Sequence, residues 1–349
     1  MFFSKIYLSA LLFALFLVCG CSSTESVKVP VKAAKESPQL EQRADALKKK
    51  ISHFAVRGIV LDTNSIRYRN VEQTVERLRK MGFNRVLFGL QEGDLAYGSD
   101  ATEFFGLCRR AGIDVYGLLR QTDAVYKPSN NLFMRKFFDE KVTLAGVTAG
   151  FAKQNRFLSE EKRLKGFVLS MTPHLFNSSD PARPSGCPYS WGDSRFGTGL
   201  DNECLIRFSI REVEEAVRAA APLPVMVQIP DSYYGFVNAG KLPKGLLDRF
   251  ALSGEKKREL ILLNSGNKPS ELFKRVESGL KEVPGEIPLL TAVNLAPHTA
   301  VVKGELRRRD WNDMVRSISY AVTKYRGHRK MTGLILGPFD RLELLLEEK

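Results

Sequence analysis

Several residue types are scarce in this 349-residue chain, and each scarcity excludes a class of site. It has five cysteines and four histidines, without a CxxC or HxxxH spacing, so no common zinc site is predicted. No long apolar run follows the first 21 residues, so we expect no later segment to cross a bilayer. The sequence therefore predicts neither a resident metal nor a cofactor.

The first residues have the pattern of an export signal. Lys5 is the only charge before Cys21, and the apolar run IYLSALLFALFLV follows it. The ending Val18-Cys19-Gly20-Cys21 resembles the lipobox of bacterial lipoproteins. That resemblance implies cleavage after Gly20 and an N-terminal diacylglycerol on Cys21. Ser22 and Ser23 lack the Asp that retains enterobacterial lipoproteins at the inner membrane, so we expect an outer-membrane anchor facing the periplasm.

The charge is strongly positive, at +14 with a pI near 9.5. A basic surface attracts polyanions, which in a cell envelope are lipid headgroups, lipopolysaccharide phosphates or acidic glycans. Nucleic acid is not an expected partner, because the leader directs the chain out of the cytoplasm. Clusters such as Lys48-Lys49-Lys50 lie in helix-forming stretches and indicate solvated faces.

The predicted organisation is a signal peptide at residues 1–20, a lipidated tether at 21–37 and a single domain at 38–349. The tether is polar and has no periodic apolar pattern. A hydrophobic content of 44% and a charged content of 26% are typical of a folded domain. An amphipathic helix over Pro38–Ile51 opens the domain.

Eight short apolar runs, separated by helical patterns, predict strands that are covered on both faces. The runs are Val56–Leu61, Arg85–Leu90, Asp114–Leu119, Gly166–Met171, Pro224–Ile229, Leu260–Leu263, Ile287–Val293 and Thr332–Leu336. A closed (β/α)8 TIM barrel and an open doubly wound sheet both fit eight such units. The first turn, Asp62-Thr63-Asn64-Ser65, lacks the glycines of a phosphate loop, which favours the barrel.

Functional side chains of a barrel follow its strands, and here these positions hold acids, amides and aromatics. Such a set suits a glycan, because sugar hydroxyls need hydrogen-bond partners and sugar rings lie on aromatic faces. We expect Glu92 and Asp231 to be the carboxyl pair of a hydrolase, with Asp62 as a third candidate. The expected substrate-binding residues are Asn64, Gln91, Arg120, His174, Trp191, Gln228, Tyr233, Tyr234 and Asn294.

The stretches GFNRVLFGLQEGD and AGIDVYGLL resemble the glycoside-hydrolase-like TIM barrels of bacterial envelope proteins. The resemblance implies a barrel that acts on a glycan. The best-known retaining families place a carboxylate after strands four and seven. Here Ser170-Met171-Thr172-Pro173 and Asn294-Leu295-Ala296-Pro297 stand at these ends. A barrel that binds a glycan or a protein without catalysis therefore remains the alternative.

Other interpretations remain open for single residues. Asp62 can cap the first helix, and Glu92-Gly93-Asp94 can be a solvated turn. Asp231 after Pro230 can start a turn, and His174 and His298 can meet as metal ligands. Cys187 and Cys204 flank a loop that contains Trp191, and an oxidising compartment would allow them to pair. Cys108 lies on the apolar face of a predicted helix, as a buried free thiol.

Overall fold

A computed structural model describes residues 38–67, 69–120, 144–170, 213–230, 259–264, 287–295, 300–302, 305–307, 311–325 and 330–347. These residues belong to one compact unit, Pro38–Lys349. In the described ranges, no helix is long and apolar enough to cross a membrane.

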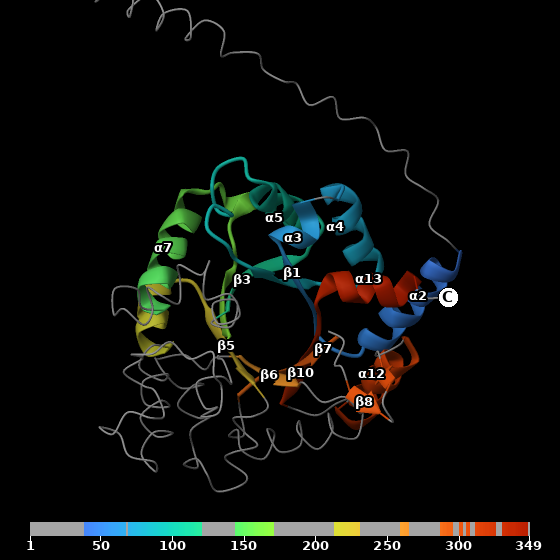
Figure 1. The fold of residues 1–349 in the computed structure, drawn as a ribbon. Helices are drawn as coiled ribbons and strands as arrows, with labels where there is room; N and C mark the ends of the chain where they lie inside the picture. Colours follow the sequence, from blue (N-terminus) through green and yellow to red (C-terminus); the bar gives the residue numbers. More distant parts are fainter. Residues whose placement is uncertain are drawn as a thin grey trace, which may run out of the picture. The chain divides into compact units, whose positions relative to one another are not determined.

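Eight parallel strands form a closed barrel, in the order β1-β2-β3-β4-β5-β6-β7-β10 around the ring (Figure 1). Val56 of the first strand pairs with Gly333 of the last, and this pairing closes the ring. The TIM-barrel prediction is therefore confirmed. The strands are β1 (Val56–Asp62), β2 (Arg85–Gly89), β3 (Asp114–Arg120), β4 (Gly166–Ser170), β5 (Val225–Pro230), β6 (Leu260–Asn264), β7 (Leu289–Asn294) and β10 (Met331–Gly337).

Helices follow the strands and lie outside the ring (Figure 1). They are α2 (Pro38–Ile51), α3 (Thr63–Arg67), α4 (Val71–Lys80), α5 (Asp100–Arg110), α7 (Leu144–Phe157), η2 (Glu160–Lys162), α12 (Trp311–Tyr325) and α13 (Phe339–Glu347), and residues 213–220 are also helical. A small antiparallel hairpin, β8 (Ala300–Val302) with β9 (Glu305–Arg307), was not predicted from the sequence.

The apolar residues form two clusters, because successive side chains of a strand point to opposite faces. One cluster fills the barrel interior, and the other joins the outer faces of the strands to the helices. The interior residues are Leu87, Leu118, Val168, Met226, Ile261, Leu290, Ala292 and Ile335. The interior is thus a packed core, and a ligand must bind at one end of the barrel rather than inside it.

Glycines end two of the helices. Gly82 follows α4 with φ 81°, and Gly112 follows α5 with φ 73°. After Gly82, the N–H of Phe83 donates to the carbonyl of Leu78, and this bond satisfies a carbonyl at the helix end. A side chain disfavours this left-handed backbone, so glycine sets where each helix stops.

An ion pair lies at the amino end of the barrel. Arg85 at the start of β2 pairs with Glu259, and the two side chains are 12% and 31% exposed. The Arg85 guanidinium also lies 4.8 Å from the ring centre of Tyr116. Burial raises the pKa of Tyr116, and the nearby positive charge of Arg85 opposes that rise. In parallel eight-stranded barrels, active sites lie at the opposite, carboxyl end.

Candidate functional site at the carboxyl end of the barrel

Alternation along the strands places polar residues on the interior face of the barrel at its carboxyl end. Val60, Val168 and Met226 belong to the interior packing. Asp62, Ser170 and Gln228 follow them by two residues each, on the same face of β1, β4 and β5. We call Asp62, Ser170 and Gln228 the mouth layer. It is polar, and it rests on an apolar core.

Ser170 and Gln228 form a buried pair within the mouth layer. They are neighbours in the register of β4 and β5, and Nε2 of Gln228 donates to Oγ of Ser170 over 3.1 Å. The side chains are 6% and 7% exposed. A buried amide and hydroxyl that fix each other can present their remaining hydrogen-bond groups to a polar ligand. Gln228 was an expected binding residue, whereas Ser170 was considered only as a strand-end polar group.

Asp62 is held in a fixed orientation by the helix that follows it. Its Oδ1 accepts hydrogen bonds from the backbone N–H and the hydroxyl of Ser65, both at 3.0 Å. This is the capping arrangement that the sequence allowed as an alternative. Capping uses one carboxylate oxygen, so it is compatible with a second role for the other. Asp62 is half-buried.

Asp94 is the buried carboxyl group beside Asp62. The hydroxyl of Thr63 donates to its Oδ1 over 2.6 Å, and the backbone N–H of Gln91 donates to its Oδ2 over 2.7 Å. Burial raises the pKa of Asp94, these two hydrogen bonds lower it, and the charge of Asp62 raises it further. The interpretation of residues 92–94 as a solvated turn is therefore wrong for Asp94, which joins the loops that follow β1 and β2.

The remaining described candidates lie around this layer. Glu92, Gln91 and Asn64 are exposed, on the loops after β2 and β1. Arg120 and Asn294 are the last residues of β3 and β7. These five positions belong to the ends of four strands, of which β1, β2 and β3 are consecutive in the ring, while β10 separates β7 from β1.

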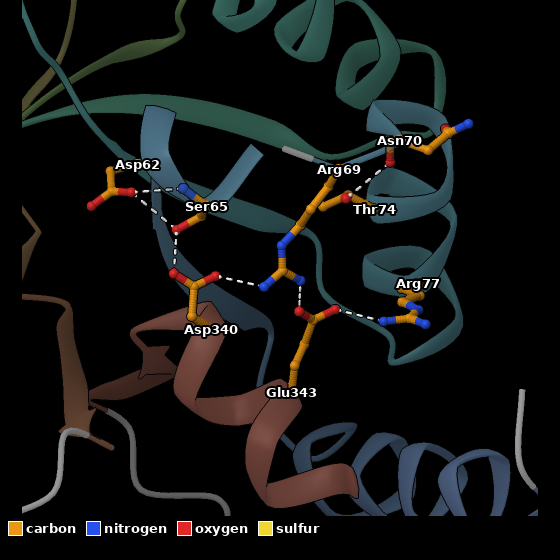
Figure 2. A network of polar contacts seen from close by, with 8 residues as sticks. All are labelled: Asp62, Ser65, Arg69, Asn70, Thr74, Arg77, Asp340 and Glu343. Carbon is orange, nitrogen blue, oxygen red and sulfur yellow. Dashed lines mark hydrogen bonds and ion pairs between the residues drawn. The ribbon is translucent and has the colours of Figure 1, made fainter. Parts of the chain in front are cut away.

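Asp340, which follows the last strand of the ring, belongs to an ion-pair network (Figure 2). Nη2 of Arg69 lies 3.0 Å from Oδ1 of Asp340, and Oγ of Ser65 lies 3.2 Å from Oδ2. Glu343, one turn further along α13, pairs with both Arg69 and Arg77. The network connects α13 to the segment after β1, so Asp340 has a structural role beside the mouth.

Other expected site residues lie outside the described residues, namely Cys21, His174, Cys187, Trp191, Cys204, Asp231, Tyr233, Tyr234 and His298. Their predicted roles, the Cys187–Cys204 disulfide among them, stay predictions. Among the residues that the structure describes, no cluster of His, Cys, Asp and Glu could hold a metal ion. Cys108 is a buried free thiol, as predicted, and burial raises its pKa, so it is no nucleophile.

Comparison with known proteins gives structural neighbours only. No protein-family profile and no curated protein matches the sequence. A GH18 chitinase from Pseudoalteromonas aurantia is similar at a TM-score of 0.49 and 8% identity, over 84% of this chain and 99% of that chain. A β-glucosidase from Thermotoga maritima gives a TM-score of 0.48 at 10% identity, over 82% and 89% of the two chains. A xylanase from Cellvibrio japonicus gives 0.47 at 15% identity, over 85% and 87%. These neighbours are glycoside hydrolases, and at TM-scores below 0.5 their activities assign none to this chain.

Proposed function

We propose that this protein is a lipid-anchored envelope protein whose barrel acts on a glycan at the carboxyl ends of its strands. The observation that carries the proposal is the mouth layer, a carboxylate, a hydroxyl and an amide above an apolar barrel core. Active sites of parallel eight-stranded barrels lie at this end. Carboxylate, amide and hydroxyl groups are also the partners that sugar hydroxyls require.

The proposed chemistry is hydrolysis by two carboxyl groups. Such pairs are about 5–5.5 Å apart for retention and about 6.5–9.5 Å apart for inversion. In the ring order, β5 lies directly opposite β1. We therefore propose Asp62 and Asp231, the residue after Pro230, as the first pair to test. Glu92, expected as the partner of Asp231, follows β2 and is exposed, and it becomes the alternative.

The second candidate function is glycan or protein binding without catalysis. Two observations favour it. Oδ1 of Asp62 is occupied by the cap of α3, and the strand-end residues Ser170 and Asn294 are not acids. In this case the same mouth would recognise its ligand by hydrogen bonds, and no carboxyl pair would be needed.

The proposed location is the outer membrane, with the domain in the periplasm and Cys21 bearing the diacylglycerol. The support is the leader sequence, with its single charge, apolar run and lipobox-like end. One acyl chain gives only marginal membrane binding, so a diacylated cysteine is the kind of anchor that holds a soluble domain stably.

A glycan-binding and hydrolysis screen tests the function. Purified protein is compared with Asp62→Asn, Asp231→Asn and Glu92→Gln. Turnover lost in Asp62→Asn and Asp231→Asn but kept in Glu92→Gln supports the proposed pair. If turnover is lost in Glu92→Gln and kept in Asp62→Asn, Glu92 is the partner of Asp231 in the carboxyl pair. Binding without turnover in the parent protein supports the second candidate, and full activity in all three variants contradicts the hydrolase.

A further inference from the structure

Two aromatic side chains project from the same flank of the barrel. Tyr97 is 94% exposed and Phe157 is 80% exposed, compared with 55% for Leu344 and 41% for Tyr320. A single exposed apolar side chain needs no explanation. Tyr97 and Phe157 are both highly exposed, and contacts through η2 connect the segments that carry them. We therefore consider the two residues as parts of one surface.

Contacts with η2 connect the two aromatics. Nζ of Lys162 lies 5.8 Å from the ring centre of Tyr97, and η2 packs along α5. Arg163 turns back toward α7, where its Nε donates to the carbonyl of Leu158 over 2.7 Å. Phe157 precedes Leu158. The chain that carries Phe157 is therefore held beside the chain that contacts Tyr97.

Positive charge is concentrated in the segment that carries Phe157, and one of its cations, Lys162, contacts Tyr97, whose own segment contains the acids Asp94 and Asp100. Residues 153–165 contain five cations and two acids. Lys153 is exposed one helical turn before Phe157, and Arg163 is also exposed. One of the two acids, Glu160, lies 3.9 Å from Arg109 and is thus partly balanced by a cation of α5. We call Tyr97, Lys153, Phe157, Lys162 and Arg163 the aromatic–basic flank.

We propose that the aromatic–basic flank binds the surface of an anionic lipid bilayer. Aromatic rings prefer the headgroup region, and cations near an anionic surface are attracted to its phosphates. Phe157 favours lipid over an acidic glycan, because its ring has no polar group for a sugar hydroxyl. This surface goes beyond the proposed activity and does not depend on it. It would give the barrel a second, reversible membrane contact and a preferred orientation.

Hydrogen exchange of the full chain on vesicles tests the proposal. The protein is mixed with vesicles of phosphatidylglycerol and phosphatidylethanolamine, or with vesicles of phosphatidylcholine alone. We expect amide exchange over residues 153–165 to slow about tenfold on the anionic vesicles only. Salt at about 0.5 M screens charges strongly, so it should restore the faster exchange. The double variant Lys153→Gln/Phe157→Ser should lose this protection.

The matched control is Arg316→Gln/Leu344→Ser, which changes an exposed cation and an exposed apolar residue on α12 and α13. It should keep the protection of residues 153–165, and melting curves should show both double variants folded. Equal exchange on both vesicle types overturns the proposal. Protection by a soluble acidic polysaccharide but not by anionic vesicles also overturns it and indicates a glycan partner.

Discussion

Nη1 of Arg85 lies 2.6 Å from Oε2 of Glu259, and this pair joins β2 to the start of β6 at the amino end of the barrel. A charge that is mostly removed from water needs its partner, because an unpaired buried ion is costly. The pair therefore specifies which strands face each other at this end. It is also the part of the barrel furthest from the proposed site, so its effects on stability and on activity can be separated.

Glu259→Gln should destabilise the fold by about 1–3 kcal/mol, because it leaves the Arg85 guanidinium without its counter-charge in a largely buried position. Chemical denaturation measures the change. The matched control is Arg79→Gln, which removes an exposed pair with Glu76 and should leave the melting temperature nearly unchanged. Equal effects of the two variants would mean that the Arg85 pair is no more important than a surface pair.

Glu343→Gln should also destabilise the fold, by about 1–3 kcal/mol, because one buried carboxylate neutralises both Arg69 and Arg77. The control Glu347→Gln changes an exposed acid at the end of the same helix. Thermal unfolding of both variants provides the comparison. If Glu347→Gln lost as much stability, the cause would be the loss of a negative charge on α13 and not the ion-pair network of Figure 2.

Asp94→Asn should change how stability depends on pH. Burial raises the folded-state pKa of Asp94, so ionisation destabilises the fold. The stability that protonated Asp94 contributes is complete below the unfolded pKa of 3.8 and is lost as pH rises through the higher folded value. Asn cannot ionise. The melting temperature of the variant, relative to that of the parent, should therefore increase as pH rises from 3 toward 7, roughly the range in which a carboxyl group titrates. If the melting temperature of the variant fell relative to that of the parent over this pH range, the raised pKa of Asp94 would be contradicted.

Asp62→Asn separates the two roles of this residue. Asn caps helices about as well as Asp, so the melting temperature should change little. Loss of the charged carboxylate should cut turnover by about 100- to 10,000-fold if Asp62 takes part in proton transfer or nucleophilic attack. Asp62→Ala, which also loses the helix cap, should lower both the melting temperature and the turnover. Normal turnover in Asp62→Asn would restrict the residue to capping.

Cys21→Ala should release the protein from membranes, because it removes the only proposed site of lipid attachment. Fractionation of cells into soluble and membrane material measures the change, with membranes washed in about 0.5 M salt so that the electrostatic contact of the aromatic–basic flank is screened. Ser22→Ala is the control, since a substitution beside the modified cysteine should leave the protein with the envelope. A Cys21→Ala protein that still pellets with membranes would show that lipid on this residue does not hold it.

The strands were predictable because each is a short apolar run that ends in polar residues. The predicted start of β1 at Val56 and of β6 at Leu260 agree with the structure, as does the helix Pro38–Ile51. The hairpin of β8 and β9 was not predictable in the same way, since each strand has only three residues. Such a stretch is too short to show the alternation that marks a strand.

The candidate site was only partly predictable from sequence. Asp62 and Gln228 follow from strand ends alone. The burial of Asp94 does not, because Glu92-Gly93-Asp94 has the composition of an exposed turn and its partner Thr63 comes from another βα unit. Likewise, Ser170 gains importance only through the register that places it beside Gln228. Contacts between units depend on ring closure, which local sequence does not encode.

The pairing of β1 with β10 has a consequence for how the chain is made. The first strand has no partner on one side until β10 has been synthesised, so a nascent chain carries two open edges up to that point. Open edges recruit strands from other molecules. A chaperone that shields the early strands would therefore be most needed late in synthesis, and loss of the last strand should cause aggregation rather than a smaller stable fold.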